Sequence, residues 1–280
     1  MIRIQREIGL ALLPPRHEAY LVEAQRLQKA YASQIHILIG FEGEFIRPSF
    51  TEHVQRLAAP AEVDYFIGSL HHVHSIPIDY DANMYAAAVK ASSKGGTEEG
   101  LFEDYYDLQY EMLKSLKPRV VGHFDLIRLM SSEPGRDLKE WKGVWEKVMR
   151  NLRTAKENGG WLECNTSALR KGLAEPYPCR QISEVCHTLI LQSDAEVADQ
   201  DVQEWLKMGG KFTMSDDSHG IAQVATNYAR ATEYLTSLGV QEVWTLKRKP
   251  HPGVAGEQRA ELEEVKVPIE VFEETFKQPS

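Results

Sequence analysis

The sequence predicts an α/β protein built around a parallel sheet, and two observations carry this prediction. Short runs of apolar and β-branched residues alternate with longer stretches of helical periodicity over most of the chain. Polar side chains gather directly after the strand-like runs, where parallel α/β folds place their functional groups. The pattern fits either a barrel or a doubly wound layer. One domain is expected over residues 1–280, because no linker rich in Pro, Gly or Ser divides the chain.

The elements are predicted in chain order from this periodicity. A helix is expected to open at Pro14 and Pro15, because proline is favoured in a first helical turn. It leads into IHILIG, which reads as a buried strand over residues 35–40. The further strands are expected at 64–70, 120–122, 161–165, 211–215 and 242–246. Helices are expected between most of them, for example at 100–116, 137–159 and 224–239. Loops are expected at 91–100, 191–200 and 249–258, and a peripheral tail over 266–280.

The composition excludes several classes of protein. The chain has 32 basic and 41 acidic residues, a formal charge of −9, so it has no overall attraction to nucleic acid. With 42% hydrophobic and 26% charged residues, it is expected to be globular rather than disordered. No apolar run approaches the roughly 20 residues that cross a bilayer, so no membrane partner is expected. Three cysteines offer no disulfide framework, and we expect a cytoplasmic location. The sequence predicts no oligomeric state.

Side chains typical of metal ligands follow five of the predicted strands. In chain order they are Glu42 and Glu44; His71, His72 and His74; His123 and Asp125; Asn165; and Asp216, Asp217 and His219. Histidine with carboxylate is the donor set of divalent ions such as Zn, Mn and Fe. Any one histidine alone would more often be a hydrogen-bonded structural residue, but five strand ends in order indicate a metal site. Strand alternation separates His71 from His72 and His74 without choosing between them.

Two basic residues follow the fourth of these strands, within NTSALRKG. A guanidinium such as that of Arg170 suits bidentate phosphate binding, whereas a solvated basic pair of Arg170 and Lys171 at a helix start fits the pattern equally well. The chain has no G-x-S-x-G, P-loop or G-x-G-x-x-G motif. Neither a serine nucleophile nor a nucleotide cofactor is therefore expected.

Longer motifs show a family resemblance. The segments GFEGEFI, DYFIGSLHHVH, VVGHFDLIRL, LECNTSALRKG and SDDSHG resemble the polymerase-and-histidinol-phosphatase (PHP) superfamily in order and spacing. Within it, the chain is similar to the histidinol-phosphatases of fungal histidine biosynthesis, over roughly residues 12 to 246. The resemblance implies a distorted (β/α)7 barrel with up to three divalent metals. The implied reaction is hydrolysis of L-histidinol phosphate, a small-molecule phosphate ester, to L-histidinol and inorganic phosphate.

The resemblance also implies roles for individual residues. The implied metal ligands are Glu42, His71, His123, Asp217 and His219. This set favours His71 over its two neighbouring histidines. Arg170 is implied to hold the phosphate, and Glu44 or Asp125 is expected to hold the imidazole or amine of the substrate. Metal ions would lower the pKa of a bound water and neutralise phosphoryl oxygens during in-line attack.

The sequence departs from the family pattern in two places. The family carries an H-x-H motif and then a T-E-H motif on its first two strands, and neither precedes the helix expected at Pro14. We therefore expect a barrel without its first two strands, weak binding of one or two metals, and activity that is much reduced or absent. The unpaired sheet edges of such a barrel favour self-association. The stretch between Tyr177 and Lys211 is longer than one connecting helix needs, which indicates an insertion.

Two hypotheses compete with the histidinol-phosphatase interpretation. One is a PHP phosphoesterase with another substrate, and NTSALRKG favours histidinol phosphate over it. The other is a remnant without catalysis that persists as a binding or regulatory protein. The absence of the first motif is its main support.

Overall fold

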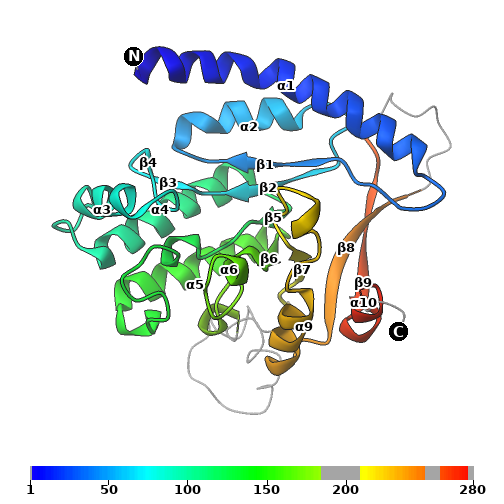
Figure 1. The fold of residues 1–280 in the computed structure, drawn as a ribbon. Coiled ribbons are helices and arrows are strands. Elements are labelled where there is room, and N and C mark those ends of the chain that lie inside the picture. Colours follow the sequence, from blue (N-terminus) through cyan, green and yellow to red (C-terminus); the bar gives the residue numbers. More distant parts are fainter. Residues whose placement is uncertain (1, 184–208, 250–258, 277–280) are drawn as a thin grey trace.

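A five-stranded parallel sheet lies at the centre of the molecule (Figure 1), whose computed structural model describes residues 2–183, 209–249 and 259–276. In sheet order the strands are β1 (Gly40–Glu44), β2 (Tyr65–Ser69), β5 (Val120–Val121), β6 (Trp161–Asn165) and β7 (Phe212–Ser215). Ile67 lies opposite Glu42 of β1 on one side and opposite Val120 of β5 on the other. The predicted α/β class with a parallel sheet is confirmed.

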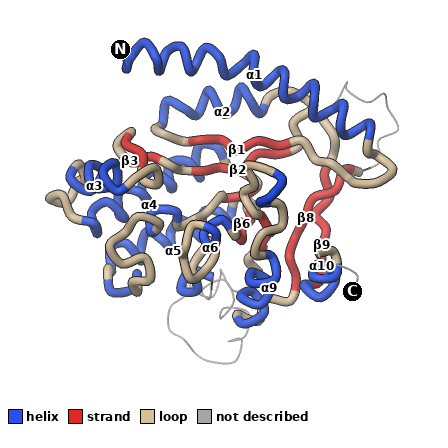
Figure 2. The backbone as a smooth tube through the Cα atoms, in the orientation of Figure 1, coloured by secondary structure: helices blue, strands red, loops and turns tan. Residues whose placement is uncertain are grey.

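Figure 2 shows the helices around the sheet, and α2 and α4 lie on the same face of it. Gly43 of β1 lies against Val54 of α2, and its register partner Gly68 of β2 lies against Met112 of α4. The described helices are α1 (Ile2–Ala30), α2 (Thr51–Ala58), α3 (Ala82–Lys90), α4 (Glu98–Leu116), α5 (Lys142–Glu157), α6 (Ser167–Arg170), α9 (Tyr228–Ser237) and α10 (Ile269–Glu274). Short 3-10 helices are η1 (Pro48–Phe50), η2 (Leu126–Arg128), η3 (Leu138–Glu140) and η4 (Ile221–Gln223). None of the helices in the described part of the chain has the length and apolar character needed to cross a membrane.

The main core lies between the sheet and the long helix α4. This helix begins at Glu98, inside the stretch predicted as a loop, because the Thr97 hydroxyl caps it by accepting from the N–H of Gly100 at 3.1 Å. Tyr105 and Met112 of α4 are fully buried in one apolar cluster with Leu152 of α5. This packing fixes the helices against the sheet and so holds the carboxyl ends of the strands in place.

The first strand begins later than predicted. Residues 35–39 form no strand, and β1 starts at Gly40. Ile39 is 1% exposed because it packs with Leu21 and Val63, and its N–H donates to the carboxylate of Asp64 at 2.7 Å. The apolar run therefore reflects packing against α1 rather than strand pairing.

The prediction that the first helix opens at Pro14 and Pro15 is wrong. Both prolines lie inside α1, which begins at Ile2. Proline fixes φ near the helical value, which suits a first turn, but it has no N–H to donate, so α1 continues through Pro14 and Pro15 without the two backbone hydrogen bonds that other residues would make there. The hydroxyl of Tyr20 in this helix donates to the carbonyl of Gly40, and α1 thereby shields part of an edge strand.

The strand predicted at 242–246 does not join the parallel sheet. It forms β8 (Glu242–Arg248), which pairs antiparallel with β9 (Leu262–Pro268). Only some residues of β8 are buried, whereas all five residues of β6 are buried. Partial burial is typical of an antiparallel ribbon with one face in solvent, and full burial is typical of a strand inside a parallel sheet. The described part of the predicted tail completes β9 and forms α10, whose Phe272 ring lies 5.5 Å from that of Tyr228 in α9. The loop predicted at 191–200 lies outside the described residues, as does nearly all of that predicted at 249–258.

Candidate metal centre

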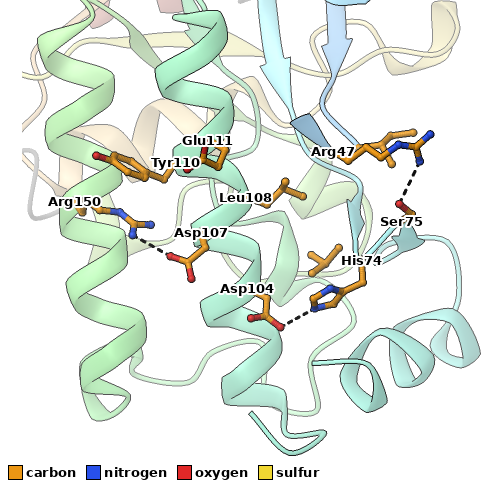
Figure 3. A pocket seen from close by; sticks show the side chains of 11 residues that line it. Arg47, His74, Ser75, Asp104, Asp107, Leu108, Tyr110, Glu111 and Arg150 are labelled. Carbon is orange, nitrogen blue, oxygen red and sulfur yellow. Dashed lines mark hydrogen bonds and ion pairs between the residues drawn. The ribbon is translucent and has the colours of Figure 1, made fainter. Parts of the chain in front are cut away.

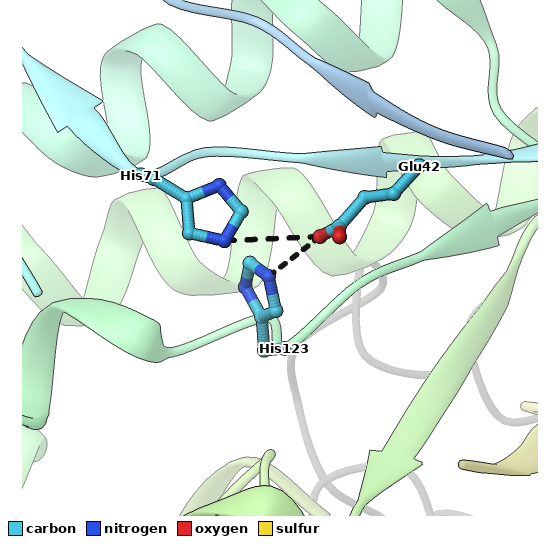
Figure 4. A group of neighbouring side chains, drawn as sticks. All are labelled: Glu42, His71 and His123. Atoms are coloured by element: carbon cyan, nitrogen blue, oxygen red, sulfur yellow. Dashed lines mark hydrogen bonds and ion pairs between the residues drawn. The ribbon is translucent and has the colours of Figure 1, made fainter. Parts of the chain in front are cut away.

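Three predicted ligands meet at the carboxyl ends of β1, β2 and β5, which are neighbours in the sheet (Figure 4). Glu42 lies two residues before the end of β1, and His71 and His123 lie two residues after the ends of β2 and β5. Their potential ligand atoms all lie within 4.8 Å of one another. Parallel neighbouring strands end at the same edge, and this geometry brings together residues that are distant in sequence.

The three side chains are closely spaced and partly open to solvent. Nε2 of His123 lies 3.0 Å from Oε1 of Glu42, and Nε2 of His71 lies 3.8 Å from the same oxygen. The two imidazole rings are 4.6 Å apart between centroids, in an edge-on arrangement. The His123 side chain is 3% exposed and that of Glu42 is 42% exposed, so the group is accessible from the Glu42 side.

Glu44 holds the ring of His71. Its carboxylate accepts from Nδ1 of His71 and from the His71 backbone N–H at 3.2 Å, and it also lies 3.1 Å from Nδ1 of His72. Because Nδ1 of His71 is bonded to Glu44, Nε2 is the nitrogen left facing Glu42. A carboxylate behind a histidine is a common way to fix the tautomer and orientation of a metal ligand.

Strong ion pairing shifts the pKa values of this group. Burial raises the pKa of Glu42, but the hydrogen bond with His123 and the charges of His123 and His71 lower it to about 2. Burial also raises the pKa of Glu44, and its bonds with His71 and His72 lower it to about 2. Burial lowers the pKa of His71, but the hydrogen bond and charge of Glu44 and the charge of Glu42 raise it to about 9. A positive charge is therefore strongly favoured between these carboxylates.

The residues present fit a divalent metal ion. Two imidazole nitrogens and one carboxylate oxygen form a donor set that zinc and neighbouring metals use, with further positions left for water or substrate. Nδ1 of His123 is buried without a hydrogen-bond partner, so neither the ring's orientation nor its tautomer is fixed through that atom. Its Nε2 is the nitrogen that faces Glu42.

Asp217 and His219 are not part of this three-residue group. They follow β7, at the edge of the sheet opposite β1. The His219 side chain is 76% exposed, and its Nδ1 lies 2.9 Å from the backbone carbonyl of Asp217. The structure therefore places these two predicted ligands together, on a loop of their own.

Arg170 anchors that loop. Its Nη1 and Nη2 atoms donate to the backbone carbonyls of Asp216 and Asp217, at 2.9 and 3.0 Å. Lys171 adds a weaker contact, with Nζ 4.0 Å from the carboxylate of Asp217. Arg170 and Lys171 therefore both lie beside the loop that carries Asp217, and the guanidinium of Arg170 is bonded to backbone carbonyls of that loop.

Asp125 does not have the position expected of a substrate-binding residue. It is fully buried, and its Oδ2 accepts from Nε of Arg128 at 2.8 Å and from the backbone N–H of Cys179 at 2.9 Å. Arg128 in turn donates to the carbonyls of Glu175 and Pro176. This carboxylate therefore ties η2 to the segment after α6, and its described hydrogen bonds are all to the protein itself.

His74 contacts helix α4 and is not part of the three-residue group. It lies at the turn of the hairpin formed by β3 (His72–Val73) and β4 (Ile76–Pro77), with Nε2 2.7 Å from Asp104 of α4. The two residues line a cavity of about 600 Å³ over α4, which Arg47 and Arg150 also line (Figure 3).

The letters of the T-E-H motif do occur once, at residues 51–53. They lie on helix α2, where His53 is bonded to Arg56.

Comparison with known proteins identifies the family. The PHP domain model matches residues 16–167. Over 234 residues the chain is 38% identical to a probable histidinol-phosphatase of Schizosaccharomyces pombe, covering 83% of this chain and 70% of that protein. The chain belongs to the PHP family. A histidinol-phosphatase of Saccharomyces cerevisiae is 30% identical to this PHP-domain chain, over 78% of the chain and 67% of the relative.

A solved structure shows the same fold. It is the histidinol phosphate phosphatase of Lactococcus lactis in complex with zinc, L-histidinol and phosphate. Its TM-score with this PHP chain is 0.56 at 19% sequence identity, and the match covers 81% of this chain and 76% of the other. The family model and the two fungal relatives confirm the family expected from the motifs, and this structure shows its fold.

Two acidic residues near the three-residue group of this PHP chain were not predicted. Glu163, inside β6, accepts from the backbone N–H of His123 at 2.8 Å. Asp79 follows Ile78, whose N–H donates to the carbonyl of His71 at 3.0 Å, and its charge helps to raise the pKa of His71. The sequence did carry a signal for Glu163, because a charged residue in the middle of a strand predicted to be buried is unusual. Asp79 has no comparable signal, because the hairpin that brings it close was not predicted.

Proposed function

We propose that this chain is a metal-dependent phosphomonoesterase that hydrolyses L-histidinol phosphate to L-histidinol and phosphate in histidine biosynthesis. The convergence of Glu42, His71 and His123 is the observation that carries the proposal. The names of the two fungal relatives support the substrate. The Lactococcus lactis protein, of the same fold, was solved with zinc, L-histidinol and phosphate.

Glu42, His71 and His123 would hold a divalent ion, with zinc as the first candidate because the donor set contains two imidazoles. When bound, such an ion lowers the pKa of water so that hydroxide forms at neutral pH, and it neutralises phosphoryl oxygens. Glu44 keeps Nδ1 of His71 occupied, which presents Nε2 to the ion. Asp217 and His219 are the candidate ligands of a second ion, on the loop that Arg170 holds.

The charges around the site match the two ends of the substrate. The phosphate carries negative charge, and Arg170 retains N–H groups beyond the two that it donates to the loop, so it can still meet a phosphate oxygen. The amine and imidazole of histidinol attract carboxylates, and Asp79 lies beside His71 without a hydrogen-bond partner among the described residues. We assign the phosphate to Arg170 and the cationic end to the Asp79 side of the site.

A metal-binding chain with slow turnover is the second candidate. It is favoured because, within the described residues, only three potential ligands come together in one group. When two ions take part in phosphate hydrolysis, together they stabilise both the attacking and the leaving oxygen, and each ion needs its own protein ligands. One complete ligand group would bind an ion and give only part of that stabilisation.

Comparison of substrates distinguishes these functions. Phosphate release is measured from L-histidinol phosphate, p-nitrophenyl phosphate and phosphoserine with zinc-loaded protein. The proposal predicts the highest kcat/KM for L-histidinol phosphate, by at least about tenfold, because its cationic end is bound as well. Equal values for all three esters would favour another substrate. No release by folded, zinc-bound protein would favour the second candidate.

A further inference from the structure

Glu163 is a buried carboxylate that no ion pair compensates among the described residues. It lies within β6 and is 4% exposed. Its Oε2 accepts from the backbone N–H of His123 at 2.8 Å and from Nδ2 of Asn165 at 3.0 Å. The other highly buried carboxylates in the described part of the chain, such as Glu103 with Lys94 and Lys147, have cationic partners.

Such a charge is costly to bury without a cation or a metal ion nearby. Two neutral N–H donors satisfy the hydrogen bonding of one oxygen but leave the net charge of Glu163 uncompensated. The bond to His123 connects this carboxylate directly to a residue of the candidate metal centre. A divalent ion held by that centre would supply the missing positive charge.

The hydrogen bond from His123 to Glu163 lies at a strained position of the backbone. His123 has a φ of +21°, a conformation that residues other than glycine rarely adopt. Gly122 before it has no room for a side chain, because a Cβ there would collide with Oγ of Ser69. The hydrogen bond from the His123 N–H to Glu163 holds this turn, and the turn places Nε2 of His123 against Glu42.

We propose that Glu163 is a positioning residue of the metal centre with two effects. It fixes the backbone of His123 so that the ring faces Glu42, and its charge increases the affinity of the site for a divalent cation. The inference rests on the metal centre of the proposed function and not on the identity of the substrate. It predicts that the same charge that destabilises the metal-free protein strengthens metal binding.

The substitution Glu163→Gln tests this prediction, with Glu103→Gln as the matched control. Both replace a buried carboxylate by an amide of nearly the same shape. Zinc affinity is measured by competition with a chromophoric chelator, and Tm is measured on the metal-free protein. We expect Glu163→Gln to weaken zinc binding by about tenfold or more, without lowering the metal-free Tm. Glu103→Gln is expected to lower Tm and leave zinc affinity unchanged, because it breaks two ion pairs that involve none of the three candidate ligands.

Two results would overturn the proposal. One is a Glu163→Gln protein that binds zinc as tightly as the wild type. The other is a metal-free Tm that falls as it does in Glu103→Gln, which would contradict the premise that the charge of Glu163 destabilises the metal-free protein. Glu163→Asp retains the charge and should bind zinc with intermediate affinity. If Glu163→Gln does not fold, wild-type affinity in Glu163→Asp would overturn the positioning effect, because the shorter side chain cannot hold the His123 N–H in the same way.

The experiment distinguishes a failure of the proposed metal centre from a failure of the role proposed for Glu163. A wild-type protein that binds no zinc would contradict the metal centre itself. A wild-type protein that binds zinc, with a Glu163→Gln variant that binds it equally well, would contradict only the role of Glu163.

Discussion

Nε2 of His123 lies 3.0 Å from Oε1 of Glu42, although 81 positions separate the two residues in the chain. The strands that carry them are not neighbours, because β2 lies between β1 and β5. The two side chains therefore meet across the end of β2, where His71 joins them. Three consecutive strands of the sheet each contribute one side chain to the group.

Glu44 is predicted to control metal affinity through His71. The substitution Glu44→Gln removes the charge that accepts from Nδ1 of His71, so the ring loses its fixed orientation and some of its basicity. We expect zinc affinity to fall about 10 to 100-fold, the usual effect of losing such a partner. Isothermal titration on metal-free protein measures this change. Glu52→Gln, at an exposed position of α2, is the control, and an equal affinity in both variants would refute the prediction.

The stability of the metal-free protein should depend on pH in a defined way. The pKa of His71 is raised from 6.5 to about 9, so its contribution is complete below 6.5 and is lost as the pH rises to about 9. The pKa of Glu44 is lowered from 4.5 to about 2, so its contribution is lost as the pH falls from 4.5 to about 2. The same ion pair gives both effects. Its stabilisation is therefore greatest between these two ranges.

Zinc should reverse the trend at high pH. The ion replaces the proton on His71, so the increase in Tm on adding zinc should grow as the pH rises from about 6.5 to 9. Melting curves across this range, with and without zinc, measure the increase. Calorimetry at pH 7.5 in two buffers of different ionisation enthalpy should show release of about one proton per ion bound. A pH-independent effect of zinc would mean that His71 is not a ligand.

The pair of Asp125 and Arg128 is predicted to stabilise the fold without contributing to the chemistry. The Asp125 side chain is fully buried and that of Arg128 is 6% exposed. Replacing Arg128 by Ala leaves a buried carboxylate unpaired, which should lower the free energy of unfolding by about 3 to 5 kcal/mol. Urea denaturation of the metal-free protein gives this value. The double substitution of Asp125→Asn with Arg128→Met should cost less, and a larger loss in the double variant would contradict the argument.

Arg170 is predicted to act mainly on substrate binding. Arg170→Lys keeps a positive charge but cannot donate to the carbonyls of Asp216 and Asp217 in the same two-pronged way. We expect KM for the phosphate ester and Ki for inorganic phosphate to rise together, by about tenfold, the scale of one charge-assisted hydrogen bond. Arg56→Lys on α2 serves as the control. A fall in kcat with both binding constants unchanged would assign Arg170 to another role.

Much of the candidate site could be predicted, because its residues stand near the ends of apolar runs that are recognisable as strands in the sequence. Glu42, His71 and His123 each stand near the end of a short apolar run, and parallel strands end at one edge. The sequence alone could not separate His71 from His72 and His74. That choice depends on the hairpin of β3 and β4, whose two-residue strands have too little periodicity to detect.

The errors arise where tertiary packing decides the structure. The run that ends at Ile39 is as apolar as a buried strand, yet it packs on α1 and gives its N–H to Asp64. Asp125 lies after a strand like the other candidates, but Arg128, one helical turn later, takes its carboxylate into the core. Strand alternation predicts that Asp125 and His123 both lie near the site, but it does not show that Asp125 is already bonded to Arg128.

Phosphate release from L-histidinol phosphate shows whether Glu42, His71 and His123 form a zinc-dependent active site. It is measured after EDTA treatment and zinc addition, for the wild type, His123→Ala and the surface control His53→Ala, with bound zinc quantified in each protein. We expect zinc-dependent release by the wild type and by His53→Ala. In His123→Ala we expect release to fall by at least about 100-fold and the bound zinc to be lost. Undiminished release by His123→Ala would rule out His123 as a ligand of the active ion, and no release from folded, zinc-bound wild-type protein would rule out the proposed activity.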